Sequence, residues 1–285
     1  MTGILNIDKP AGWTSHDVVA KLRRALSERR IGHGGTLDPM ATGVLPVFVG
    51  RATRAVEFIE NADKEYLAGL RFGLVTDTQD TTGTVLAEGG PIPGEDDIRA
   101  ALENFLGPQS QLPPLYSAIK VDGKKLYQYA RAGKTVERQP RQITISELEP
   151  LGFQDGEYRF RLVCTKGTYV RTLCHDLGQA LGCGGAMSSL RRLRAGVFRA
   201  ESASPLEAVV EACGAGFLQP LDSLFQQYPA WTLDGEQARR CRCGSELGLD
   251  VPDGTCRLYD EAGAFLALAE AADGRVKTLK SFYEV

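Results

Sequence analysis

The segment Gly32–Pro39 carries the first side chains whose types and spacing could do chemistry. Its glycines indicate unusual backbone angles and close approach by another group. Asp38 precedes Pro39, which disfavours helical backbone at the aspartate and gives its carboxylate a fixed direction. Taken alone, an Asp-Pro pair is more often the start of a turn, and His33 is more often a hydrogen-bonded loop residue than a catalyst.

A second segment, Cys164–Leu173, places Arg171 where a helix is expected to begin. The helix dipole disfavours a cation at that end, so a carboxylate from elsewhere in the chain is the natural partner. A two-point contact with arginine would aim the carboxylate and keep it ionised. The alternative is a solvated arginine that contributes little to stability, and spacing alone favours that alternative.

Asp77 and Asp80 are spaced like paired carboxylates within Thr76–Gly83. A run of threonines and aspartates that ends in glycine is equally typical of a capped turn ahead of a strand. No third ligand accompanies the two acids, so the structural interpretation is preferred for both.

Positive charge is concentrated in one part of the chain, although the net charge is −3. Residues 111–200 hold 15 basic and 7 acidic groups, a local charge of +8. A polyanion senses this local field, because salt screens charges beyond about 8–10 Å. In Gln111–Arg141 the cations alternate with tyrosines, which suits RNA, since rings stack on unpaired bases. The alternative is a solvated lysine face over core tyrosines, and the charge excess favours RNA.

The elements that must position these residues alternate irregularly. A helix capped by Ser15 would bury Val18, Val19 and Leu22 on one face. Further helices are expected at 98–106 and 173–181, and strands at 3–8, 44–50, 66–72, 143–148, 158–164 and 197–200. Most connections are too short for parallel crossovers, which favours an α+β fold with a mixed, mainly antiparallel sheet. Pro46 makes a central position for its strand doubtful.

The last part of the chain differs in composition from the rest. Residues 201–285 hold 7 basic and 14 acidic groups, a local charge of −7. Short strands are expected at 256–259, 265–269 and 276–283. The sequence therefore predicts a small β-rich domain at 229–285 after a larger domain at 1–228.

Composition excludes several classes of protein. The chain is 43% hydrophobic and 24% charged, as soluble globular proteins are. No apolar run approaches the roughly 18 residues that span a bilayer, and no signal peptide is evident, so we expect a cytoplasmic protein without a membrane partner. The 7 cysteines form no CxxC motif, which predicts free thiols, Cys241 and Cys243 included, and no metal site.

Six segments, in order and with consistent spacing, resemble the bacterial tRNA pseudouridine-55 synthase family, TruB. The resemblance covers roughly residues 3–225. The segments are Gly3–His16, Gly32–Leu45, Lys64–Asp80, Pro113–Lys120, Lys166–Leu173 and Leu190–Arg194. It implies the mixed-sheet pseudouridine synthase fold with a small C-terminal domain of the RNA-binding PUA type. It also implies a monomeric isomerase that acts on uridine 55 in the T-arm of tRNA without a cofactor, metal or guide RNA.

The resemblance further implies roles for individual residues. Asp38 would be the catalytic aspartate, Arg171 its ion-pair partner, and Tyr66 the ring that stacks on the extruded uracil. His33 would help to hold the T-loop, and Tyr169 and Leu190 would line the pocket. Residues 117–141 would clamp the RNA stem-loop. The side chains predicted to contact RNA are Lys120, Lys124, Lys125 and Arg131 in this clamp, and Lys9 and Lys166 outside it.

Three other functions compete with this one. An RNA chaperone would use the basic tract but would not need Asp38 and Arg171 to meet. A guide-RNA-dependent pseudouridine synthase shares the core motifs, but a longer basic extension would be expected. A glycosidase or nucleosidase would need a second acid near Asp38, and the motif offers none.

Overall fold

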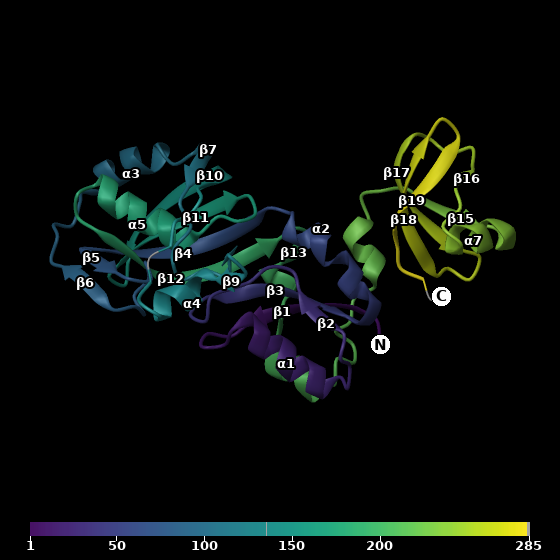
Figure 1. Ribbon diagram of the computed structural model, residues 1–285, viewed down its shortest axis with the longest axis horizontal. Coiled ribbons are helices and arrows are strands. Elements are labelled where there is room, and N and C mark those ends of the chain that lie inside the picture. Colours follow the sequence, from purple (N-terminus) through teal and green to yellow (C-terminus); the bar gives the residue numbers. More distant parts are fainter. Residues whose placement is uncertain (135, 284–285) are drawn as a thin grey trace.

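The computed structural model of the protein describes residues 1–134 and 136–283. Figure 1 shows an elongated molecule, in which a long curved sheet with helices packed on it is followed by a separate small sheet. The N-terminus lies near the middle of the molecule, beside the junction between these two parts (Figure 1).

The larger sheet has the strand order β14-β1-β3-β12-β4-β11-β10-β7, with β2 paired to β3 and β13 to β12. Its strands are β1 Gly3–Lys9, β2 Ile31–His33, β3 Thr42–Val49, β4 Lys64–Phe72, β7 Gly107–Gln111, β10 Arg141–Gln154, β11 Glu157–Cys164, β12 Gly185–Ala195, β13 Phe198–Arg199 and β14 Ser204–Pro205. Among the described residues of this sheet, only β1–β14 and β3–β12 are parallel neighbours. The predicted α+β fold with a mixed, mainly antiparallel sheet is therefore confirmed.

Two short hairpins and seven helices complete the described part of the chain. The hairpins are β5 Leu74–Thr76 with β6 Val85–Glu88, and β8 Lys120–Val121 with β9 Lys124–Lys125. The α-helices are α1 Ser15–Ala25, α2 Val56–Glu60, α3 Glu95–Glu103, α4 Leu126–Arg131, α5 Val170–Ala180, α6 Leu206–Glu211 and α7 Gly235–Arg242. Short 3-10 helices lie at Gly50–Ala55, Ala200–Ser202 and Leu221–Phe225.

The C-terminal sheet has the order β15-β17-β18-β19-β16. Its strands are β15 Ala230–Leu233, β16 Leu247–Gly248, β17 Gly254–Asp260, β18 Phe265–Ala272 and β19 Arg275–Ser281. It has a buried cluster of its own with α7. A second cluster joins Leu268 and Phe282 to Phe225 of the preceding segment. The small β-rich domain predicted from the sequence is thus present and is packed against the rest of the chain.

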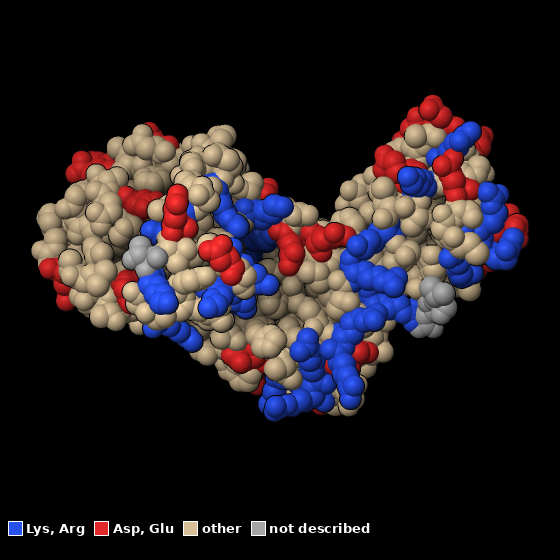
Figure 2. Space-filling view, in the orientation of Figure 1, with Lys and Arg blue, Asp and Glu red and all other residues tan. Residues whose placement is uncertain are grey.

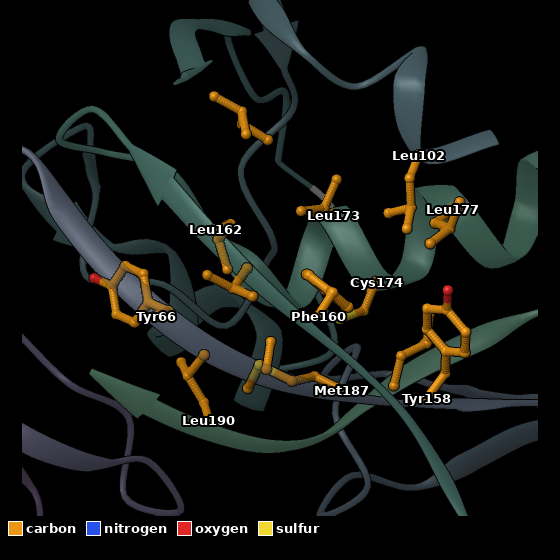
Figure 3. Close-up of a cluster of buried hydrophobic side chains, with 14 of the residues drawn as sticks. Tyr66, Leu102, Tyr158, Phe160, Leu162, Leu173, Cys174, Leu177, Met187 and Leu190 are labelled. Carbon is orange, nitrogen blue, oxygen red and sulfur yellow. The ribbon is translucent and has the colours of Figure 1, made fainter. Parts of the chain in front are cut away.

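The main core lies between the larger sheet and helices α3 and α5. Leu102 of α3 and Leu173 of α5 pack with Phe160 of β11 in one buried cluster (Figure 3). Each such side chain contributes about 1.5–3 kcal/mol when fully buried. Tyr66 and Leu190 belong to the same cluster and lie at its end, with the Tyr66 hydroxyl directed away from it (Figure 3). The core therefore continues into the surface where the candidate site is found.

Thr14, one residue before the predicted cap, caps α1. Its Oγ1 accepts the N–H of Asp17 at 3.0 Å, and Asp17 Oδ2 accepts the N–H of Thr14 at 2.9 Å. Ser15 is buried instead, and its Oγ accepts the N–H of Leu37 at 2.8 Å. The hydroxyl that was assigned to capping therefore ties the start of α1 to the residue before Asp38.

Pro46 occupies an interior strand, contrary to expectation. β1 pairs along one edge of β3, and on the other edge β12 pairs with Thr42 and Gly43 while β2 pairs with residues 47–49. The Pro46 carbonyl accepts the N–H of Gly34, which directly follows β2. Since the N–H and C=O of a strand residue point to the same edge, the missing donor falls at the end of the β2 pairing, where β12 gives way to β2.

Gly43 lies where β3 and β12 pair in parallel over only two residues each, a short contact that we call the crossing of these strands. Its φ is +97°, and a Cβ atom at this position would overlap the backbone of Arg192. The crossing therefore requires glycine for two reasons, conformation and space. It holds the segment that carries Asp38 against β12.

We predict that Gly43→Ala lowers the free energy of unfolding by about 3 kcal/mol or more, because strain and overlap act together. Gly12→Ala is the matched control, since Gly12 has φ +82° and no other atom within 4 Å of the position of a Cβ. It should cost about 1 kcal/mol. Urea unfolding of both variants measures the difference, and equal losses would show that backbone conformation alone requires the glycine.

Candidate active site

A pocket of about 730 Å³ opens beside the end of the main core. It is lined by the first turn of α1, the Gly32–Pro39 segment, the start of β4, the start of α5 and Leu190 of β12. Its size is that of pockets that bind small molecules or single nucleotides. Asp38, Tyr66 and Arg171, the three predicted catalytic residues, all line it.

Asp38 and Arg171 meet at the wall of this pocket. Arg171 Nε lies 2.9 Å from Asp38 Oδ2, and Nη2 donates to Asp38 Oδ1 at 3.3 Å. The guanidinium also donates to the carbonyl oxygens of Thr78 at 3.1 Å and Tyr116 at 3.0 Å. The Arg171 side chain is 6% exposed and that of Asp38 is 34% exposed. The carboxylate is thus held by both oxygens while a third of its surface faces the pocket.

Asp80 completes the environment of the guanidinium. Its Oδ2 lies 3.5 Å from Arg171 Nη1, and its side chain is 6% exposed. Interpreting Asp80 as only a turn residue was therefore incomplete, because it also balances the charge of Arg171. Asp77 fits the structural interpretation, since its Oδ1 accepts the N–H of Thr84 at 2.7 Å and caps the turn.

The ionisation of Asp38 reflects two opposing influences. Burial raises the pKa of Asp38, and the nearby Asp80 adds to the rise. The charges of Arg171 and Lys9 act in the opposite direction. Since the net direction is upward, the arginine favours the charged form but offsets the cost of burial only in part.

Lys9 lies behind Asp38 and is fully buried. Its Nζ donates to the carbonyl oxygens of Pro10 at 2.9 Å, Trp13 at 2.6 Å and Pro39 at 3.2 Å. Burial lowers the pKa of Lys9 to about 8, and the charge of Asp38 opposes this shift. A side chain without exposed surface does not reach an RNA phosphate. The RNA contact predicted for Lys9 is therefore not supported, and Lys9 instead ties the turn after β1 to the backbone next to Asp38.

Two further buried cations surround the same segment. Arg192 of β12 is 1% exposed, and it donates to the carbonyl oxygens of Val44 at 2.7 Å and Gly35 at 3.0 Å. Lys64 donates to three carbonyl oxygens at the end of α2 and just beyond it, and burial lowers its pKa to about 8. Neither was singled out in the sequence, because a basic residue next to leucine or glutamate resembles an ordinary surface cation.

Tyr66 presents a largely buried ring to the pocket beside Leu190. Burial raises the pKa of Tyr66, and the guanidinium of Arg192 opposes the rise. The phenol is therefore protonated at neutral pH. A flat apolar face with a neutral hydroxyl suits stacking on a planar base.

His33 and Tyr169 also line the pocket. Burial lowers the pKa of His33 to about 4, and the charge of Arg192 acts in the same direction. The imidazole is therefore neutral at physiological pH. Its Nδ1 is buried and has no hydrogen-bond partner among the described residues. Tyr169 is fixed through its backbone N–H, which donates to Gln111 Oε1 at 2.8 Å.

The insertion at 117–141 lies over the pocket as the β8–β9 hairpin and α4. Lys125 and Arg131 line the pocket, together with Tyr127 between them. The Arg131 guanidinium lies 5.4 Å from the centre of the Tyr127 ring, so charge and aromatic surface are presented together.

The other basic residues that were predicted to contact RNA do not line the pocket. Lys120 and Lys124 are exposed on the β8–β9 hairpin, where they face solvent. Lys166 lies before α5, and its Nζ donates to Asn61 Oδ1 at 2.7 Å. Any RNA contact by these three side chains therefore falls outside the pocket.

Among the described residues, no group of three or more His, Cys, Asp or Glu side chains comes together as metal ligands would. The 7 cysteines are free thiols. In the part of the chain that the structure describes, no helix has the length and apolar character needed to cross a membrane.

Comparison with known proteins decides the family. The model of the TruB family pseudouridylate synthase N-terminal domain matches residues 23–170, and that of the tRNA pseudouridylate synthase B C-terminal domain matches 171–226. A tRNA pseudouridine synthase B from Opitutus terrae is 51% identical over 73% of this chain and 87% of its own length. One from Clostridium kluyveri is 39% identical over 99% of this chain and 100% of its own.

The chain belongs to the TruB pseudouridine synthase family. It is therefore an isomerase that acts on tRNA. A solved structure of a Cbf5-Nop10-Gar1 complex contains a chain with the same fold, with a TM-score of 0.73, 28% identity and coverage of 99% of this chain and 85% of that one. A box H/ACA ribonucleoprotein bound to a substrate RNA containing 2′-deoxyuridine gives a TM-score of 0.73 at 26% identity, with the same coverage. These likenesses confirm the predicted pseudouridine synthase fold.

We predict that His33 makes stability depend on pH. Its folded pKa of about 4 lies below the ordinary value of 6.5, so the unfolded chain binds the proton more tightly. Stability should therefore be complete above pH 6.5 and should fall as the pH is lowered toward 4. His33→Gln should flatten this part of the profile relative to wild type, as measured by urea midpoints at a series of pH values. An unchanged profile would contradict a buried neutral His33.

Proposed function

We propose that this protein converts uridine 55 in the T-loop of tRNA to pseudouridine, by covalent action of Asp38, without a cofactor or guide RNA. The observation that carries the proposal is the geometry of Asp38, held at both carboxylate oxygens by a buried guanidinium yet 34% exposed to a pocket of nucleotide size. We further propose that it works as a monomer in the cytoplasm.

The chemistry requires the target base to leave the RNA stack. The bond between ribose C1′ and uracil N1 breaks, a bond from C1′ to C5 forms, C5 loses a proton and N1 gains one, so no electrons are exchanged. Asp38 acts as the nucleophile, at C1′ of the sugar or at C6 of the base, and either route needs the ionised carboxylate. Extruding a base costs a few kcal/mol, which is least in a loop.

The residues around Asp38 fit an extruded uridine. Tyr66 offers a flat face for the uracil, with Leu190 beside it and Tyr169 also lining the pocket. His33 presents a neutral imidazole at the pocket wall, where the surrounding loop nucleotides would lie. Arg171 holds the nucleophile in direction and favours its charged form.

The RNA stem is held by the clamp formed by residues 117–141. Lys125 and Arg131 line the pocket, while Lys120 and Lys124 point outward from the hairpin, where phosphates beyond the target nucleotide would lie. Lys166 extends the same charge next to α5. We also propose that residues 1–228 are the catalytic domain and that 229–285 is a separate RNA-binding domain of the PUA type.

Action without a guide RNA is supported by the higher sequence identity of this chain to tRNA pseudouridine synthases B than to the similar chain in the Cbf5 complex. Two relatives that are named tRNA pseudouridine synthase B share 39% and 51% identity with this chain. The similar chain in the Cbf5 complex shares 28%. A protein that acts alone on tRNA is therefore the better-supported alternative.

We predict that Asp38→Asn abolishes product formation, because an amide is not a nucleophile, while the dissociation constant for RNA stays within about tenfold of wild type. The measurement is release of tritium from tRNA transcript labelled at C5 of uridine. Wild type should release it from a T-arm hairpin without guide RNA, and should not do so when position 55 is cytidine.

Two of the rival functions give a different result in this assay. Binding without release would indicate an RNA chaperone. Release that requires an added guide RNA would indicate a ribonucleoprotein enzyme. Appreciable turnover by Asp38→Asn would remove Asp38 from its catalytic role.

We predict that Arg171→Gln lowers kcat/KM by about 10²–10³-fold, because the nucleophile loses both its direction and part of its charge stabilisation. The pKa of Asp38 is already raised by burial, and loss of the guanidinium should raise it further. The acid limb of the pH profile should therefore move to higher pH. Arg99→Gln, at an exposed arginine 3.8 Å from Glu95, is the control. An unshifted acid limb in Arg171→Gln would refute the ion pair as the cause.

A further inference from the structure

The far end of α1 carries a second basic surface, which the proposed function does not use. We call it the arginine belt, and it consists of Arg23, Arg24, Arg29, Arg30, Arg51 and Arg54. These residues belong to the last turn of α1, the loop before β2 and the 3-10 helix Gly50–Ala55. Figure 2 shows Lys and Arg atoms in a band that runs from α1 toward the C-terminal sheet.

The belt keeps its positive charge. Arg24, Arg29 and Arg30 are exposed, and within the described residues their side chains have no ion-pair or hydrogen-bond partner. Glu28 is the one acidic residue in the sequence between Asp17 and Asp38. Its carboxylate already lies 3.8 Å from the N-terminal ammonium and accepts the backbone N–H of Arg30 at 2.9 Å. Three exposed arginines without such partners attract anions.

Two open hollows indent the belt. One is lined by Arg23, Arg24 and Arg29, together with Ser27 and Glu28. The other is lined by Arg29, Arg30 and Arg51, together with the first residues of the chain, Gly50 and again Glu28. The exposed guanidinium groups of Arg24, Arg29 and Arg30 at these hollows are suited to phosphate oxygens, because each planar group can donate two parallel hydrogen bonds.

Helix α1 connects the belt to the catalytic pocket. Thr14, Ser15 and His16, at its start, line that pocket, and Arg23 and Arg24 lie in its last turn. At 1.5 Å per residue, the helix separates the two sites by about 15 Å. An anion that occupies both sites must therefore be long, which favours a nucleic acid over a free nucleotide.

We propose that the arginine belt binds the phosphate backbone of tRNA outside the T-arm, and so distinguishes the whole tRNA from an isolated hairpin. This inference rests on the proposed function, in that the T-loop supplies the nucleotide in the pocket. The clamp at 117–141 holds the stem-loop at one side of the pocket, and the belt holds a second part of the same molecule beyond the start of α1. The whole tRNA gains affinity because both contacts are made by one ligand.

The test compares three double variants. Arg29→Gln with Arg30→Gln removes two belt charges, and Lys124→Gln with Lys125→Gln removes two clamp charges. Arg71→Gln with Arg99→Gln removes two charges that lie outside both surfaces, where each is ion-paired to a glutamate. Dissociation constants are measured by fluorescence anisotropy over a range of salt concentrations, for full-length tRNA transcript and for the T-arm hairpin.

The belt variant should bind tRNA about tenfold more weakly, with a salt slope reduced by about 2, and should bind the hairpin within twofold of wild type. The clamp variant should lose affinity for both RNAs, and the third variant for neither.

Unchanged tRNA affinity of the belt variant would overturn the inference, as would an equal loss for the hairpin or in the third variant. Belt-dependent binding to phosphatidylglycerol vesicles, with tRNA affinity unaltered, would assign the belt to a lipid surface and overturn it too. These affinities need no turnover, whereas failure of wild type to modify the hairpin would refute the proposed function instead.

Discussion

The burial of four cations around the segment that carries Asp38 is the constraint on which the candidate site depends. Arg171, Lys9, Lys64 and Arg192 are each at most 6% exposed. A buried charge is tolerated only when its donors are satisfied, and here backbone carbonyls accept most of their hydrogen bonds. These carbonyls fix the turn after β1, the segment before Asp38 and the approach to β4. Two of the four cations, Arg171 and Lys9, also set the field at the carboxylate.

This arrangement makes the electrostatics of Asp38 inseparable from the fold. Its pKa is raised by burial and by Asp80, and lowered by Arg171 and Lys9. A shift in the backbone near Pro39 would move Lys9, which donates to that carbonyl at 3.2 Å, and would change the charge that Asp38 experiences. Close backbone contact, as at Gly43, keeps such shifts small. The rigid crossing of β3 and β12 thus has an electrostatic consequence as well as a mechanical one.

Local rules predicted those parts of the structure that local interactions determine. The helix that carries Arg171 could be anticipated from its apolar spacing. The dipole argument offered a carboxylate partner, but spacing alone favoured a solvated arginine, and only the family resemblance predicted Asp38, which lies at 2.9 Å. β12 could not be anticipated. Its run of leucines and arginines does not alternate, because two register shifts against β4 interrupt the pleat. Arg192, fully buried, looks in sequence like its partly exposed neighbours Arg191 and Arg194, and only the strands on either side decide that it faces inward.

Predicting the charged surfaces met a similar difficulty. The net charge of a sequence segment is an average along the chain, whereas a ligand senses the charges that lie close together in space. Residues 1–60 hold 8 basic and 6 acidic groups, an almost neutral balance. Folding separates them. Two of the cations, Lys9 and Arg23, donate hydrogen bonds to backbone carbonyls. Two of the acids, Asp17 and Asp38, lie near the start of α1, away from the exposed arginines at its end. A helix as short as α1 is enough to place an acid-containing pocket at one end and a cationic surface at the other. The field that RNA meets therefore depends on the direction of that helix more than on the net charge of the segment.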